Sequence, residues 1–206
     1  MNDFNWINNI NIYFVILDRI NQYLKKLLRT IQHDEIEKYF FYLSTELLRL
    51  VPFTEDKKEH TLFLNKKDGI CLLEGCIPFL DADLQKILDE NTNSFIKIKQ
   101  IRNKYEHEPH NVNSAFSTGH SSFSAMGFYC RTELISLNSM ELTYIIYDLN
   151  KLFDKIKNLI IEVEKNNNND LDRFNKDYIE HIKTLDFKRY NETYTRVPRN
   201  FGLLNI

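Results

Sequence analysis

An arginine, an asparagine and a histidine stand close together between Ile101 and His110. Arg102 and Asn103 are adjacent, and four residues separate Arg102 from His107. A guanidinium presents planar donors that match the oxygens of a phosphate, and an imidazole near neutral pH removes or donates a proton. These residue types suit cleavage of RNA by its own ribose 2′-OH, in which the arginine stabilises charge on the phosphate and no metal ion is needed.

A helix is predicted to carry these residues, from about residue 94 to residue 107. Its apolar stripe consists of Phe95, Ile98, Ile101 and Tyr105. Arg102 lies four residues after Ile98, so it projects from this stripe and needs an anionic partner or a wet groove that binds an anion. Pro109 disfavours helical geometry at the preceding residue and therefore ends the helix.

Asn103 and His107 are four residues apart on this helix and share a face. The amide of Asn103 can therefore hold one imidazole nitrogen, while the negative end of the helix dipole favours the imidazolium. Arg102 and His107, however, are five residues apart, which is about 140° around the helix axis. A single cleft requires either that the last turn unwinds before Pro109 or that two copies combine their residues across a two-fold axis, and we favour the dimer.

Ordinary structural roles compete with this catalytic interpretation. Arg102 and Glu106 are also four apart and can form an intrahelical ion pair. His107 at a helix end can be a cap. The proline between His107 and His110 disrupts the helix that would align them on a metal ion, so we predict no metal site. His110, Lys104 and Glu106 are secondary candidates for contact with the substrate, because they flank the same residues.

The stretch resembles the signature of the HEPN superfamily, which is an arginine commonly followed by a polar residue, then a histidine after four to six intervening residues. Arg102, Asn103 and His107 occupy those positions late in a helix. The resemblance implies a metal-independent endoribonuclease whose site is completed by a homodimer. It also implies a toxin system, abortive infection or prophage defence, with an antitoxin or inhibitor protein as a partner. The antitoxin-paired subgroup has a Tyr two residues after the His, where this chain has Pro109.

A rival interpretation belongs to a different class of protein. It is a non-catalytic helical interaction protein that binds a partner or a nucleotide in the groove of the bundle. Family members without activity lose the Arg or the His of the signature. This chain retains both Arg102 and His107, so we favour the enzyme.

Composition limits the possible fold class, the possible contact with nucleic acid and the possible cellular location. Of the 206 residues, 43% are hydrophobic and 27% are charged, and only five Gly and four Pro favour helices over a many-stranded sheet. The formal net charge of -2 gives no overall attraction to nucleic acid, so any contact with RNA must be local. Three Cys without a CxxC pair, and the lack of a signal-peptide or membrane-spanning pattern, predict a cytoplasmic protein. We predict no cofactor.

Apolar residues spaced four and three apart predict an all-α fold, an antiparallel four- to five-helix bundle. The longer helices are expected at about 4–31, 34–50 with Asp34 as the N-cap, 94–107 and 138–166, and shorter ones at 81–90 and 170–185. Residues 111–122 are predicted to be a loop, and residues 123–137 a short β-hairpin insertion. We expect residues 1–167 to form the HEPN-like bundle, and residues 168–206 to be a C-terminal helix and tail packed on the same domain.

The tail alternates basic and aromatic residues. They are Phe187, Lys188, Arg189, Tyr190, Tyr194, Arg196, Arg199 and Phe201. Such residues can hold single-stranded RNA by stacking and phosphate contacts, but we expect them instead to pack on the bundle or on a partner.

Overall fold

The computed structural model describes residues 5–51, 77–107, 112–118, 123–130 and 133–195. In chain order, its elements are α1 Asn5–Leu27, α2 His33–Leu50, α3 Ile77–Glu90, α4 Thr92–His107, β1 Val112–Thr118, β2 Phe123–Cys130, β3 Glu133–Asn138, α5 Ser139–Asn167, α6 Arg173–Thr184 and α7 Phe187–Thr195. The expectations for His110 and for the tail beyond residue 195 lie outside the described residues.

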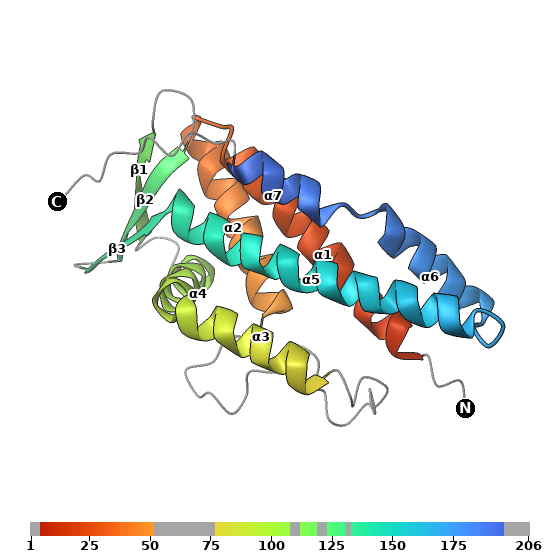
Figure 1. The fold of residues 1–206 in the computed structure, drawn as a ribbon. Coiled ribbons are helices and arrows are strands. Elements are labelled where there is room, and N and C mark those ends of the chain that lie inside the picture. The colour runs from red at the N-terminus through yellow and green to blue at the C-terminus, as the bar shows by residue number, and fades with distance from the viewer. Residues whose placement is uncertain (1–4, 52–76, 108–111, 119–122, 131–132, 196–206) are drawn as a thin grey trace.

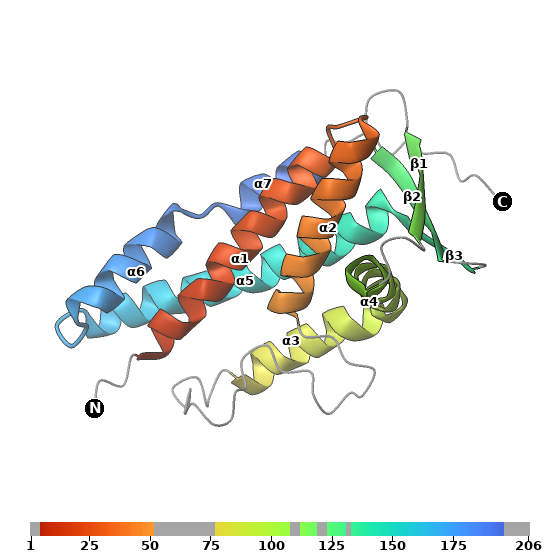
Figure 2. The same ribbon diagram turned by 180° about the vertical axis from the view of Figure 1, so that it is seen from behind.

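Helices dominate the structure, which confirms the predicted mainly helical fold. The helices α1 and α2 form an antiparallel hairpin, and the long helix α5 runs alongside α1 (Figure 1). The helices α6 and α7 pack on α1 and α5, while α3 and α4 lie below them in Figure 1. The view from behind shows the sheet standing at the end of the bundle where α5 begins (Figure 2).

An aromatic cluster joins three helices in the core. Phe14 of α1, Phe153 of α5 and Phe187 of α7 are at most 1% exposed, and their ring centroids lie 5.1 to 6.4 Å apart. Phe187 begins a helix where we predicted an irregular tail, and that prediction is wrong because this ring and Tyr194 pack inward. These two rings are therefore not available for stacking on RNA.

A buried amide cluster also holds α7 on the bundle. Asn21 and Asn150 are at most 1% exposed and exchange two hydrogen bonds of 2.7 and 2.8 Å. The hydroxyl of Tyr194 donates to Asn21 Oδ1 (2.7 Å), and the amide of Asn150 donates to Asn191 Oδ1 (2.9 Å). Because buried polar groups are costly unless they are paired, the cluster specifies one packing of α1, α5 and α7.

The turn between α1 and α2 differs from the sequence prediction. The helix α1 ends at Leu27 rather than near residue 31, which leaves Ile31 60% exposed. The helix α2 begins one residue before the predicted cap Asp34, and the residue at the N-cap position makes no side-chain hydrogen bond. The hydroxyl of Thr30 orders the turn instead, because it donates to Glu35 (2.5 Å) and accepts a backbone N–H (3.2 Å).

The strands form an antiparallel sheet in the order β1-β2-β3. The strands β2 and β3 are the predicted hairpin, but residues 112–118, which we predicted to be part of a loop, form β1 and pair with β2. The polar sequence of β1 does not predict a strand. The strand forms because pairing with β2 provides hydrogen bonds for its backbone N–H and C=O groups. In β3, Ile135 and Leu137 are buried and Leu134 is exposed, so one face of this strand packs on the helices.

Candidate functional site at the end of α4

The first half of α4 is tied to the start of α5. Asn138 and Glu141 form a capping box, with both hydrogen bonds 2.8 Å long, which confirms the predicted start of this helix. The Glu141 carboxylate also accepts hydrogen bonds from Lys97 Nζ (2.9 Å) and Ser94 Oγ (3.2 Å). The fully buried positions of α4 are Phe95, Ile98 and Ile101. The helix that carries the predicted residues is therefore fixed both by its apolar stripe and by polar contacts.

Arg102 forms the intrahelical ion pair that competes with the catalytic interpretation. Its Nη1 lies 2.5 Å from Glu106 Oε2, and the two side chains are 27% and 35% exposed. Its Nε is buried and, among the described residues, has no hydrogen-bond partner. The guanidinium thus lies at the edge of the core, as the stripe predicts, with one edge paired and one donor unsatisfied.

His107 is the last residue of α4, as predicted, and its side chain is exposed. Asn103 is half-buried, and in the part of the chain that the structure describes no hydrogen bond joins it to His107. The orientation of the imidazole by this amide is therefore not seen among the described residues and stays a prediction. The helix stays regular through His107, so its last turn does not unwind and Arg102 remains about 140° away around the axis.

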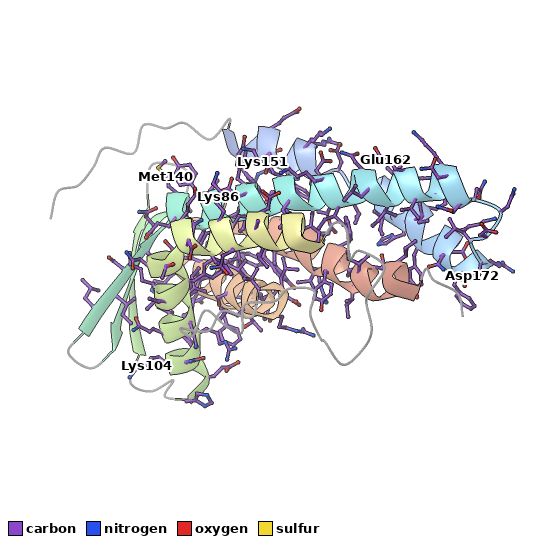
Figure 3. The ribbon with its side chains drawn as sticks, turned by 60° about the horizontal axis from the view of Figure 1, so that its bottom comes forward. Lys86, Lys104, Met140, Lys151, Glu162 and Asp172 are labelled. Atoms are coloured by element: carbon purple, nitrogen blue, oxygen red, sulfur yellow. The ribbon has the colours of Figure 1, made fainter. Side chains whose placement is uncertain are left out.

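Among the described residues, the end of α4 is exposed on one side, at Glu106 and His107, and packed on the other. Figure 3 shows Lys104 near the end of α4 that is farther from α3 and α5. The Tyr105 ring packs on α2, with its centroid 6.1 Å from that of Phe41. The candidate site is therefore a helix end that is backed by α2, with Asn103 and His107 on one face of its last turns and Arg102 on another side.

Two further findings concern the chemistry of the described residues. No three His, Cys, Asp or Glu side chains gather among them as a possible metal site. None of the described helices combines the length and the apolar character that are needed to cross a membrane.

A second candidate site was not predicted from the sequence. A cavity with a volume of about 560 Å³ opens beside the end of α1, between α2 and α7. We call it the basic cavity, and its lining includes Lys25, Lys26, Arg29, Glu35, Tyr39 and Tyr190. Two signals are present in the sequence, the group of basic residues late in the predicted helix 4–31 and the basic and aromatic residues of the tail that include Tyr190. Their meeting at one cavity could not be predicted, because they come from distant parts of the chain.

Comparison with known proteins adds no relative: no family model, no curated protein and no solved structure matches this chain. The interpretation of Arg102, Asn103 and His107 therefore depends on the residues and the geometry described above.

Proposed function

We propose that this protein is a metal-independent endoribonuclease of the HEPN kind, with its site on the last two turns of α4. The observation that carries the proposal is the state of Arg102 at the edge of the core. Among the described residues its buried Nε has no hydrogen-bond partner, and its guanidinium has a single carboxylate partner. An unsatisfied buried donor costs free energy. A phosphate that draws the guanidinium away from Glu106 would satisfy this donor and accept two parallel hydrogen bonds.

In the proposed reaction, each of the candidate residues of α4 has a different role. Arg102 binds the phosphate and stabilises the charge that builds on it. His107 removes the proton from the 2′-OH, whose oxygen attacks phosphorus while the bond to the 5′ oxygen breaks, and a second imidazole or water protonates that leaving oxygen. The products are a 2′,3′-cyclic phosphate and a free 5′-OH. Asn103 is not bonded to His107 and contacts the ribose or the phosphate, with Lys104 nearby as a second cation.

A homodimer is part of the proposal, because one copy holds Arg102 and His107 on different sides of a regular helix. Two copies related by a two-fold axis bring the arginine of one copy beside the histidine of the other. The open end of α4 is the surface on which the two copies would meet.

The biological setting follows from the resemblance alone. A nuclease of this kind acts on cellular RNA in the cytoplasm, as a toxin or a phage-defence effector, and is kept inactive by an antitoxin or another inhibitor protein. This chain has Pro109 where the antitoxin-paired subgroup has a Tyr that is a target for nucleotidylation, so the proposed inhibitor acts by binding the protein.

The first experiment compares cleavage of structured and single-stranded RNA by the purified wild type, Arg102→Ala and His107→Ala, with EDTA present. Two matched controls are available. Arg49→Ala removes an arginine that is also ion-paired along its own helix, and His181→Ala removes an exposed histidine in the last turn of α6. We expect only the two α4 variants to lose cleavage. A folded wild type that cuts no RNA would contradict the proposal and favour the non-catalytic interaction protein, for which the Arg102–Glu106 pair is an ordinary surface contact.

The second experiment tests the composite site. Co-expression of Arg102→Ala and His107→Ala yields mixed dimers in which one of the two sites is intact. Since half of the dimers are mixed, we expect about a quarter of the wild-type activity to return. A mixture as inactive as either variant alone would show that the two residues act from the same copy.

A further inference from the structure

Three basic side chains at the end of α1 have no acidic partner among the described residues. Lys25 and Lys26 lie in the last turn of α1, Arg29 follows in the turn to α2, and all three are exposed. None of them forms an ion pair in the described part of the chain, whereas Arg19 on the same helix is paired with Glu46. Three unpaired cations around one cavity create a local positive potential in a chain whose net charge is -2.

The other charged groups of the basic cavity are already engaged. Glu35 is the only acidic residue among the described residues of the lining, and its carboxylate accepts a hydrogen bond from Thr30 (2.5 Å). Lys26 Nζ lies over the Tyr39 ring, 5.3 Å from its centroid. Lys25 and Arg29 are therefore the cations that remain to bind an anion.

Tyr190 forms a rigid aromatic wall of the basic cavity. Its hydroxyl donates to Asp18 (3.0 Å), and its ring stacks on Tyr194 with a centroid distance of 6.4 Å and an interplanar angle of 18°. Burial, followed by the charge of Asp18, raises the pKa of Tyr190 to about 12, so the ring is neutral at physiological pH. A neutral ring that is supported on one face suits the stacking of a nucleic-acid base on the other.

A second cavity of about 340 Å³ adjoins the first. It shares Lys25 and Tyr190 with the basic cavity and adds Arg189 of α7. Its carboxylates are engaged, because Asp18 accepts from Tyr190 and Asp186 accepts the backbone N–H of Arg189 (3.0 Å). A space of several hundred Å³ holds a small ligand of about the size of one nucleotide, so two joined cavities fit consecutive nucleotides.

We infer that the basic cavity binds single-stranded RNA, with Lys25 and Arg29 on a phosphate and a base stacked on Tyr190. The second cavity takes the adjoining nucleotide, beside Arg189. Stacking and phosphate contacts are tolerant of sequence, so the site retains a strand without selecting particular bases.

A row of aromatic rings runs from α1 across α2 to α4, outside the lining of the basic cavity. Tyr23 of α1 lies 5.5 Å from Tyr42 of α2, Tyr42 lies 6.4 Å from Phe41, and Phe41 lies 6.1 Å from Tyr105. Tyr42 is 41% exposed, and Tyr105 lies within one turn of Arg102. A strand on this row reaches the end of α4. This last step rests on the proposed nuclease, whereas binding at the basic cavity does not.

The binding test uses a labelled 2′-O-methyl oligouridylate, which lacks the nucleophile for cleavage and so reports binding alone. Fluorescence anisotropy compares the wild type with Lys25→Gln/Arg29→Gln and with the control Lys165→Gln/Arg173→Gln, which removes two exposed cations near the junction of α5 and α6. We expect the first variant to bind roughly 10-fold more weakly, and its slope of log affinity against log salt to fall by about 0.7 for each lost contact. The control should bind like the wild type.

A second pair of variants tests the stacking. Tyr190→Leu should weaken binding roughly 10-fold, while Tyr190→Phe, which keeps the ring, should bind normally; circular dichroism checks that both fold. Equal binding by the wild type and Lys25→Gln/Arg29→Gln, or equal affinity for uridine monophosphate and the oligonucleotide, would overturn the inference. If the protein binds at the basic cavity but does not cleave unmodified RNA, only the proposed nuclease activity is contradicted. If it cleaves RNA but does not bind at the basic cavity, only the inference about the basic cavity is contradicted.

Discussion

The end of α4 and the basic cavity both concentrate positive charge, but they hold it in different ways. At α4, Arg102 is paired with Glu106, one helical turn away in the same element. At the basic cavity, Lys25 and Arg29 have no acidic partner among the described residues, and the walls come from α1, α2 and α7. A short contiguous motif thus indicates which chemistry is possible, whereas tertiary packing determines which cations remain available to an anion.

Under the two proposals, this difference corresponds to two roles for the two regions. The end of α4 carries an imidazole and a guanidinium that suit bond cleavage, and the basic cavity carries cations and a supported ring that suit retention of a strand. Variants at α4 should therefore change the rate of cleavage, and variants around the basic cavity should change the affinity for RNA.

The largest expected effect is that of His107→Ala on the single-turnover rate of RNA cleavage. Loss of a general acid or base lowers a rate by about 10²- to 10⁴-fold. Affinity for the 2′-O-methyl strand should stay unchanged, because His107 lies on α4 and not in the basic cavity. The matched variant His181→Ala should cleave like the wild type, and an equal loss in both variants would contradict the assignment.

The next largest effect is expected from Asn150→Leu, which leaves the amides of Asn21 and Asn191 without their buried partner. The loss of these hydrogen bonds should lower the free energy of unfolding by about 1–3 kcal/mol, measured by denaturant titration. The effect is not larger because Asn21 keeps its bonds to Leu17 and Tyr194, and Asn191 keeps its bond to Tyr147. RNA affinity should fall as well, because α7 carries Tyr190. The triple variant Asn21→Leu/Asn150→Leu/Tyr194→Phe, which also removes the hydroxyl that donates to Asn21, should recover part of the stability, since these three partners are then apolar. No recovery would indicate that packing rather than pairing accounts for the loss.

A smaller effect is expected from Glu106→Gln, which removes the charge that pairs with Arg102. The pair is partly exposed, so the free energy of unfolding should change by less than about 1 kcal/mol. The rate of cleavage should rise by about 2-fold. An ion pair of this kind stabilises by roughly 0.5 kcal/mol, and without it the guanidinium no longer has to leave Glu106 before it binds the phosphate. A loss of cleavage would instead give Glu106 a direct role in the reaction.

The last effect is a pH dependence at the basic cavity, which is confined to alkaline pH. The pKa of Tyr190 is raised by burial and by Asp18, so the folded chain holds this proton more tightly than the unfolded chain. Its contribution to stability is complete below pH 10, the ordinary value, and is lost as the pH rises through about 12. The free energy of unfolding of the wild type should therefore fall more steeply over this range than that of Tyr190→Phe. Parallel curves would contradict the burial of this hydroxyl.

Local physics accounts for the part of the fold that could be predicted. The four-three spacing of apolar residues identifies most helices, and Asn138 with Glu141 marks the start of α5 through a bond that spans three residues. The same locality allows both the Arg102–Glu106 pair and the position of His107 at a helix end to be predicted, because each depends only on neighbours within one turn.

By itself, the sequence determined the mainly helical fold, the helix that carries Arg102 and His107, and the angle that separates them. The tertiary structure alone decided the pairing of β1, the folding of α7 and the assembly of the basic cavity, since each depends on contacts between residues far apart in the chain. Tyr190 meets Asp18, and Asn21 meets Asn150, only after α1, α5 and α7 have packed. No local spacing encodes such contacts, because the free energy that selects them comes from burial and from the pairing of buried polar groups.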